Sequence, residues 1–344
     1  MEQEKHTRRP RVVAVGCGPW GRNIIRNLAD LGALAALVNR RNADAVAHTY
    51  RVPVVSFEEA ITDPGIQAIV IAAPPLHHPW LATQALKSGK HVYVEKAIAL
   101  ASEQIRELCS LAAAVDRRLM VGHILQYHPA FLKVLELVRS GRLGRLLFIQ
   151  ASRMNLGRIR RKEEDVVWSL APHDVSMLHA LTEGEPRVVS AVAGYHLRAD
   201  VADTVHAHLE FEGGIAAHLA LSWYHPVKEQ RLIVVGTEGM IVFDDAVPWE
   251  RKLVLYRHTL EWHAGQPKAV QGAPEPIDVE PAEPLKEELQ HFLGCIETGT
   301  TPRTDGFEAL KVVQTIEHLR GAMVACGNLR GGLPGGSGEG FAAP

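Results

Sequence analysis

The chain has 344 residues, of which 47% are hydrophobic and 22% charged, and its formal net charge at pH 7 is −2. This length is sufficient for two domains, and the nearly neutral charge excludes a global electrostatic attraction to nucleic acid or to a membrane surface. No apolar run reaches the roughly 20 residues that span a bilayer, and the polar N-terminus has no signal-peptide core, so we expect a cytoplasmic protein.

The first third of the chain alternates short apolar runs with segments of helical character. We expect strands at 11–15, 34–39, 67–72, 91–94 and 119–122, and helices near 19–31, 42–50, 57–62, 78–88 and 101–116. Strands rich in Val and Ile, without polar alternation, are typical of a parallel sheet that is buried on both faces. The pattern therefore predicts a doubly wound α/β Rossmann domain over residues 8–122.

A glycine motif follows the first expected strand. Gly16, Gly18 and Gly21 have the spacing GxGxxG at the point where this strand passes into a helix. The first glycine of such a motif permits a tight turn, the second lets the backbone approach a pyrophosphate, and the third lets the helix pack closely on the strand. The helix start also offers free N–H groups to phosphates. In this context the motif predicts dinucleotide binding.

The second expected strand ends at the position where dinucleotide-binding proteins contact the ribose of the cofactor. NAD enzymes usually have Asp or Glu at this point to hold the 2′-hydroxyl, and a nearby Arg accommodates a 2′-phosphate. This chain has Asn39, which removes the charge that would repel NADP, followed by Arg40. We therefore expect NAD or NADP as cofactor, with a preference for NADP.

The pattern changes near residue 123. We expect helices at 127–139, 172–182, 284–298 and 305–322, and strands at 145–153, 187–198, 203–212, 215–224, 231–236, 239–244 and 252–257. Hairpin turns are predicted at 212–214 and 237–239. The second domain, residues 123–326, is thus expected to be α+β, with helices on one side of a large open, mainly antiparallel sheet. The glycine-rich residues 327–344 are expected to form a disordered tail.

Two short segments carry candidate catalytic groups. Glu95 and Lys96 end the fourth expected strand, and ligands of open α/β sheets bind beyond the carboxyl ends of strands. An ordinary surface ion pair explains their position equally well. His173 follows Pro172, which suits a first helical turn, where the helix dipole would keep a general base neutral. A buried or capping histidine is the alternative, and Asp174 would either orient the ring or complement the dipole.

Basic residues are densely clustered in the loop that follows the strand expected at 145–153. The cluster consists of Arg153, Asn155, Arg158, Arg160, Arg161 and Lys162. Guanidinium groups bind pyrophosphate and carboxylate in bidentate fashion, so we expect a phosphate-bearing or acidic substrate, although a solvated basic surface is the alternative. The four cysteines and 18 histidines show no metal-ligand spacing, and no metal site is expected.

Together these features resemble the glucose–fructose oxidoreductase/inositol 2-dehydrogenase (Gfo/Idh/MocA) family, from Gly16 to about Arg320. The proline-rich segment of that family corresponds to residues 73–78, and its Glu-Lys-Pro motif corresponds to residues 95–97, with Ala97 in place of the proline. Ser169 stands where the family often has Asp, four residues before His173. The resemblance implies that Trp20, Pro74, His78 and Glu95 contact the cofactor together with the glycine motif, Asn39 and Arg40.

Within the family, residues 121–131, 153–160, 171–177 and 222–230 are most similar to the UDP-N-acetylglucosaminuronate 3-dehydrogenase branch. This resemblance implies oxidation at C3 of a UDP-N-acetylhexosaminuronate, with Lys96 and His173 as alternative formal bases. The implied substrate contacts are Lys96, Tyr127, Arg153, Asn155, Arg160, His173 and Asp174. An NADPH-dependent sugar ketoreductase and a non-catalytic cofactor sensor remain alternatives. We expect a homo-dimer or homo-tetramer formed through the open sheet, and no nucleic-acid or membrane partner.

Overall fold

The computed structural model describes residues 9–38, 43–156 and 164–325. Contacts divide the chain into two compact units, which are described separately. The first comprises residues 1–128 and 282–314, and the second comprises residues 129–281 and 315–344. The sequence pattern assigns residues 282–314 to the second domain, whereas their contacts lie within the first unit. No helix of the described segments is both long and apolar enough to cross a bilayer.

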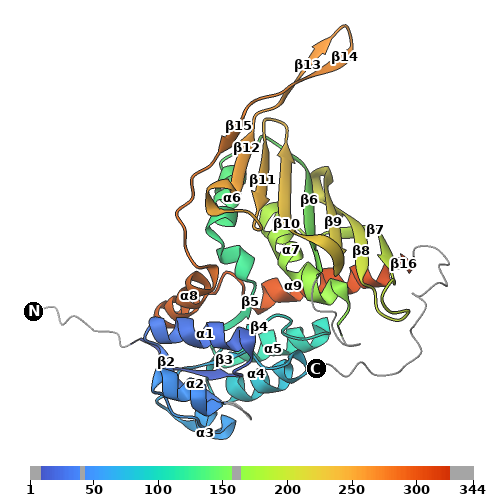
Figure 1. The fold of residues 1–344 in the computed structure, drawn as a ribbon. Coiled ribbons are helices and arrows are strands. Elements are labelled where there is room, and N and C mark those ends of the chain that lie inside the picture. The colour runs from blue at the N-terminus through green and yellow to red at the C-terminus, as the bar shows by residue number, and fades with distance from the viewer. Residues whose placement is uncertain (1–8, 39–42, 157–163, 326–344) are drawn as a thin grey trace, which may run out of the picture. The chain divides into compact units, whose positions relative to one another are not determined.

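The first unit contains a five-stranded parallel sheet with helices packed around it (Figure 1). Its strands, in the spatial order β2-β1-β3-β4-β5, are β1 (Val12–Val15), β2 (Leu34–Val38), β3 (Ala68–Ile71), β4 (His91–Glu95) and β5 (Leu119–Gly122). The helices between them are α1 (Pro19–Asp30), α2 (Ala43–Tyr50), α3 (Phe57–Thr62), α4 (His78–Lys87) and α5 (Ser102–Ala114), with the short 3-10 helices η1 (Pro75–His77) and η2 (Ile124–Tyr127). Every residue of β1 and β3 is buried. The predicted Rossmann fold is confirmed.

A helix from much later in the chain completes the core of this unit. Helix α8 (Pro284–Thr298) presents Leu289 and Phe292 to a cluster that contains Ile24 and Leu28 of α1. The helix itself follows from its apolar periodicity. The packing of α8 against α1 does not follow from the sequence, because periodicity identifies the buried face of a helix but not the surface that covers it.

The second unit is built on a nine-stranded sheet in the order β15-β12-β11-β10-β6-β9-β8-β7-β16 (Figure 1). The strands are β6 (Leu146–Leu156), β7 (Arg187–Gly194), β8 (Thr204–Phe211), β9 (Ile215–Ser222), β10 (Tyr224–Gly236), β11 (Met240–Asp244), β12 (Leu253–Tyr256), β15 (Pro274–Pro276) and β16 (Met323–Ala325). The pairs β6–β9 and β7–β16 are parallel and the other pairs are antiparallel. The expectation of a large, mainly antiparallel sheet is confirmed.

Helices α6 (Pro129–Arg139) and α7 (Val166–Thr182) contact this sheet and each other. Alternate residues of β8 are buried, as a sheet with one helix-covered face requires. The 3-10 helices η3 (Glu212–Gly214) and η4 (Trp249–Arg251) connect strands, and a further hairpin, β13 (Thr259–His263) with β14 (Gln266–Val270), forms its own two-stranded sheet. Helix α9 (Gly306–Gly321) follows α8. The sequence did not predict β13, β14, β15 or β16.

The predicted start of α7 is wrong. The helix begins at Val166, because the carboxylate of Asp165 caps it by accepting a hydrogen bond from the backbone N–H of Trp168 at 3.0 Å. Pro172 therefore lies inside the helix, where it cannot donate to the carbonyl four residues earlier. His173 lies about two turns into the helix, and the helix dipole acts mainly within the first turn. The dipole argument for a neutral His173 therefore fails.

Candidate functional site

The turn between β1 and α1 requires glycine at two of its three motif positions. Gly16 has a φ of +105°, and a Cβ there would lie 2.5 Å from the carbonyl oxygen of Ala72. A Cβ at Gly21 would lie 2.2 Å from the carbonyl oxygen of Gly16. A Cβ at Gly18, by contrast, would meet nothing within 4 Å, and Gly18 is the N-cap of α1. Open space beside the free N–H groups of a helix start fits the pyrophosphate of a dinucleotide.

This difference predicts separate effects for two alanine substitutions. Gly18→Ala should leave the melting temperature unchanged but weaken NAD(P) binding about tenfold or more, because the new methyl group occupies space that the pyrophosphate needs. Gly21→Ala should instead destabilise the fold by about 1–3 kcal/mol, since helix and turn must move apart. Thermal melts and a fluorescence titration with NAD(P) measure both. Unchanged cofactor affinity in Gly18→Ala would place the pyrophosphate elsewhere.

Glu95 and Lys96 lie at the carboxyl end of β4, as expected from the sequence. The Glu95 carboxyl is buried and accepts hydrogen bonds from the Trp20 side chain, the Tyr93 hydroxyl and the backbone N–H of Lys96. Burial raises the pKa of Glu95, and these hydrogen bonds act in the opposite direction. Lys96 is half-buried, and the peptide bond that joins it to Ala97 is cis.

His78 connects the segments that follow β3 and β4. Its ring is buried, with Nδ1 2.8 Å from the carbonyl oxygen of Ala97 and Nε2 2.7 Å from that of Ala73. Both partners are acceptors, so a neutral ring donates to one of them, and only an imidazolium donates to both and joins the residue after Lys96 to the loop that contains Pro74. Pro74 itself is exposed and precedes η1.

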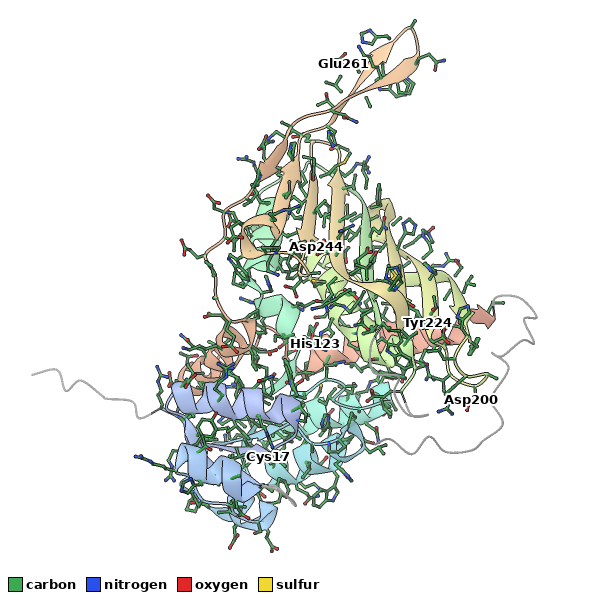
Figure 2. All side chains as sticks on the ribbon, viewed as in Figure 1. Cys17, His123, Asp200, Tyr224, Asp244 and Glu261 are labelled. Atoms are coloured by element: carbon green, nitrogen blue, oxygen red, sulfur yellow. The ribbon has the colours of Figure 1, made fainter. Side chains whose placement is uncertain are left out.

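Cys17 lies within the glycine turn, between Gly16 and Gly18 (Figure 2). It is a free, buried thiol, and burial raises its pKa, so it supplies no reactive thiolate. Within the described segments, no group of three or more His, Cys, Asp or Glu side chains is arranged to hold a metal ion.

In the second unit, two predicted substrate contacts bind each other. Nε and Nη2 of Arg153, on β6, donate to the two carboxylate oxygens of Asp174, on α7, each at 2.9 Å. Arg153 is 5% exposed and Asp174 is 1% exposed. This buried bidentate pair fixes α7 against β6 beside the half-buried His173. Asn155 is half-buried near the end of β6.

Tyr127 lies in the interior of the first unit. Its hydroxyl is 3.2 Å from Oγ1 of Thr304, and the guanidinium of Arg303 lies 4.9 Å from the centre of its ring. Burial raises the pKa of Tyr127. The polar atom predicted to contact a substrate is thus engaged within the protein.

Three predicted site residues lie outside the described residues, namely Asn39, Arg40 and Arg160. Sequence reasoning also missed a pair of buried groups, Tyr93 on β4 and Glu288 on α8, whose side chains are 3.0 Å apart. One signal for this pair was present, because Glu288 occurs on the apolar face of a helix, beside Leu285 and Phe292 in helical spacing.

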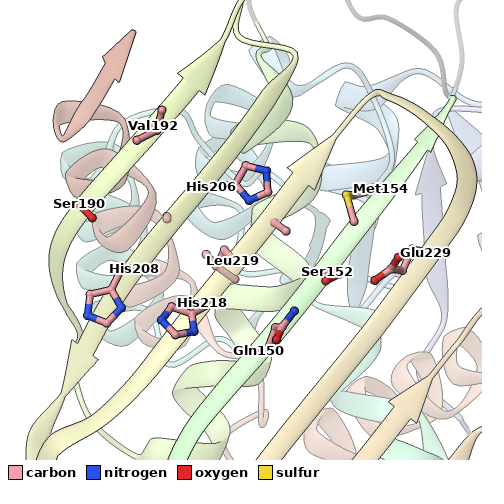
Figure 3. A pocket seen from close by; sticks show the side chains of 12 residues that line it. Gln150, Ser152, Met154, Ser190, Val192, His206, His208, His218, Leu219 and Glu229 are labelled. Carbon is pink, nitrogen blue, oxygen red and sulfur yellow. The ribbon is translucent and has the colours of Figure 1, made fainter. Parts of the chain in front are cut away.

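A shallow pocket of about 550 Å³ lies on the sheet of the second unit (Figure 3). Its lining includes His206 and His208 of β8, His218 of β9 and Val192 of β7. The rings of His208 and His218 have centroids 5.0 Å apart. Residues of β8 on this side alternate with the buried ones, so the pocket belongs to the face that α7 does not cover.

Two family descriptions match the two parts of the chain. Residues 10–123 match "Oxidoreductase family, NAD-binding Rossmann fold", and residues 131–242 match "GFO/IDH/MocA C-terminal domain". UDP-N-acetylglucosamine 3-dehydrogenase of Acidithiobacillus ferrooxidans is 26% identical over 92% of this chain and 97% of its own length. The NAD(+)-dependent scyllo-inositol 2-dehydrogenase of Bacillus subtilis is 23% identical, covering 80% of this chain and 79% of its own.

Solved structures show the same fold. A structure of the Acidithiobacillus enzyme superposes with a TM-score of 0.79 at 24% identity, covering 91% of this chain and 97% of that one. A 3-ketoreductase of Actinomadura kijaniata, solved in complex with NADP and TDP-benzene, superposes with a TM-score of 0.76 at 17% identity. The superposition covers 92% of this chain and 99% of that one.

Proposed function

Since the chain belongs to the Gfo/Idh/MocA oxidoreductase family, we propose that it is an NAD(P)-dependent enzyme that oxidises a ring hydroxyl of a nucleotide sugar. The observation that carries this proposal is the placement of Lys96 at the carboxyl end of β4, in the same parallel sheet whose first strand leads into the glycine turn. A cation at that edge is positioned to act on a substrate of a bound dinucleotide. The specific reaction proposed is oxidation at C3 of a UDP-N-acetylhexosaminuronate.

The first unit supplies the groups for the cofactor. The turn at Gly16 and Gly18 and the start of α1 would hold the pyrophosphate, and Asn39 with Arg40 would hold the ribose. Trp20, Pro74, His78 and Glu95 complete the proposed contacts. When bound, the nicotinamide supplies the acceptor for the hydride that leaves the sugar carbon.

The two catalytic candidates have complementary roles. Lys96 donates a hydrogen bond to the reacting oxygen and stabilises the negative charge that develops there. His173 is the proposed general base for the proton of the sugar hydroxyl, and Lys96 is the alternative base. The Arg153–Asp174 pair holds the helix turn that carries His173, while Asn155 and Arg160 bind the anionic groups of the nucleotide sugar.

The substrate class is tested directly with purified protein. Denaturing the protein and analysing the released nucleotide identifies any bound NAD(H) or NADP(H). Adding UDP-N-acetylglucosaminuronate and, separately, UDP-N-acetylglucosamine to the native enzyme with NAD(P) should increase the absorbance of reduced nicotinamide, with the uronate as the better substrate. Oxidation of the neutral sugar alone would exclude the uronate, and oxidation of neither would refute the proposal.

A ketoreductase is the second candidate, favoured by the Asn39-Arg40 sequence that suits NADPH. It predicts oxidation of NADPH by a 3-keto nucleotide sugar and no reduction of NADP by the hydroxyl form. The third possibility, a cofactor sensor, predicts cofactor binding without turnover of any sugar. Lys96 and His173 together favour an enzyme.

We further propose that a second copy of the chain covers the open face of the nine-stranded sheet. Val192 and Phe148 expose 45% and 37% of their surface on this face, and a second copy seated on it would bury both side chains. Val192→Glu should convert the oligomer to a monomer in sedimentation velocity, whereas Phe307→Glu, at the start of α9 and 56% exposed, should not. An unchanged sedimentation coefficient for Val192→Glu would exclude this face.

A further inference from the structure

The hydroxyl of Tyr93 lies between two buried carboxyl groups. It is 3.1 Å from Oε1 of Glu95 and 3.0 Å from Oε2 of Glu288. Tyr93 and Glu288 are both 0% exposed, and Glu95 is 9% exposed. A phenol has a single proton and can donate it to one of these oxygens only. The other contact is a hydrogen bond only if that carboxyl is itself protonated and donates to the phenol oxygen.

The surroundings decide which carboxyl carries this proton. Glu95 receives further hydrogen bonds from Trp20 and from the N–H of Lys96, and the charge of Lys96 favours its ionised form. The surroundings of Glu288 instead favour a neutral carboxyl. The titratable groups that face it are Tyr93, Glu95, Glu308 and Tyr127, and none of them is a cation.

Two further facts agree with a neutral Glu288. Its Oε1 atom is buried and has no hydrogen-bond partner within the described residues, which is far less costly for a neutral carboxyl than for a carboxylate. Burial, reinforced by the nearby Glu95 carboxyl, raises the pKa of Glu288 well above its ordinary value. The second neighbouring carboxyl, Glu308, is held by His123 and Gln126.

We propose that Glu288 is a positioning residue for the Glu95–Lys96 segment, because its protonated carboxyl donates to Tyr93 and thereby directs the Tyr93 proton to Glu95. The order of donation is Glu288 to Tyr93 to Glu95, and no bond is made or broken in it. The chain of hydrogen bonds keeps Glu95 ionised, and an ionised Glu95 keeps the adjacent Lys96 in its cationic form. The role of the Lys96 cation in catalysis rests on the proposed function. The assignment of a proton to Glu288 is independent of that function.

The proton is tested without substrate. If native Glu288 is protonated, the folded protein holds a proton that the unfolded chain releases above about pH 5, so the folded state is progressively disfavoured as pH rises. Compared with Glu288→Gln, the unfolding equilibrium constant of the wild type should therefore increase about tenfold for each pH unit between about pH 5 and 8. Glu287→Gln, an exposed neighbour on the same helix, is the control and should follow the wild type.

A parallel pH dependence in the wild type and Glu288→Gln would overturn the proposal. Infrared difference spectroscopy of the same two proteins gives an independent measurement at neutral pH. The wild type should show the carbonyl stretch of a protonated carboxyl, and Glu288→Gln should lack it. The absence of that band in the wild type would equally overturn the proposal.

The positioning role is tested by the pH profile of kcat. Glutamine at 288 still donates to Tyr93 and should preserve the profile, whereas Glu288→Leu and Tyr93→Phe remove donors and should shift its acidic limb upward by about one pH unit. If glutamine shifts the limb as far as leucine, the role as a neutral donor is refuted. If no nucleotide sugar is turned over, the proposed function fails. The unfolding and infrared measurements still show whether Glu288 is protonated.

Discussion

Replacing Lys96 with methionine is expected to lower kcat by about three orders of magnitude while the dissociation constant for NAD(P) changes less than about twofold. Methionine preserves the length and most of the volume of the side chain but removes its charge and its N–H donors. The side chain then loses its interaction with the reacting oxygen and its attraction to Glu95, whereas the glycine turn that would hold the pyrophosphate is formed by other residues. Steady-state kinetics and a cofactor titration on the same preparation measure the two quantities.

The matched control is Lys87→Met, which removes an exposed lysine at the end of α4 in the same unit. It should leave both kcat and cofactor affinity unchanged. Retention of more than about a tenth of wild-type kcat by Lys96→Met would remove Lys96 from the catalytic group and leave His173 as the sole candidate.

The substitution Asp174→Ala is expected to destabilise the protein by about 3–5 kcal/mol, because it leaves the guanidinium of Arg153 buried without its counter-charge. Both partners are almost fully buried and their contact is bidentate. By comparison, Glu136→Gln breaks the more exposed pair with Lys133 on α6 and should cost less than about 1 kcal/mol. Denaturant unfolding curves measure both free energies of unfolding.

A double substitution separates the stability of this pair from its function. Arg153→Met with Asp174→Leu replaces two buried charges by apolar side chains, and most of the lost stability should return. If the pair positions His173, kcat should nevertheless stay well below that of the wild type. A stable double variant with normal kcat would show that the pair serves only the fold.

The sequence pattern predicted the first unit well, because its information is local. The buried strands are short apolar runs, and the positive φ of Gly16 and the close approach at Gly21 are properties of the turn itself. The start of α7 was mispredicted because two competing local signals were present. Pro172 suits a first helical turn, but the Asp165 cap decides the structure.

Interactions between distant segments were beyond the sequence pattern. The spacing of Arg153 and Asp174 along the chain does not show that β6 and α7 bring them together, so both were assigned to the substrate. In the same way, Tyr93 was one apolar residue of a predicted strand, and only the packing of α8 places Glu288 against it. Such pairs depend on tertiary packing, which hydrophobic periodicity does not specify.

The outermost strands of the nine-stranded sheet have a consequence for how the protein avoids uncontrolled aggregation. At one edge, β15 has the sequence Pro274-Glu275-Pro276, and its two prolines lack the N–H groups that an added strand would need. At the other edge, β16 is only three residues long, Met323–Ala325, and pairs in parallel with β7. Both edges are therefore poor templates for further strands. Deleting β16 should expose the eight-residue edge of β7 and favour open-ended polymerisation.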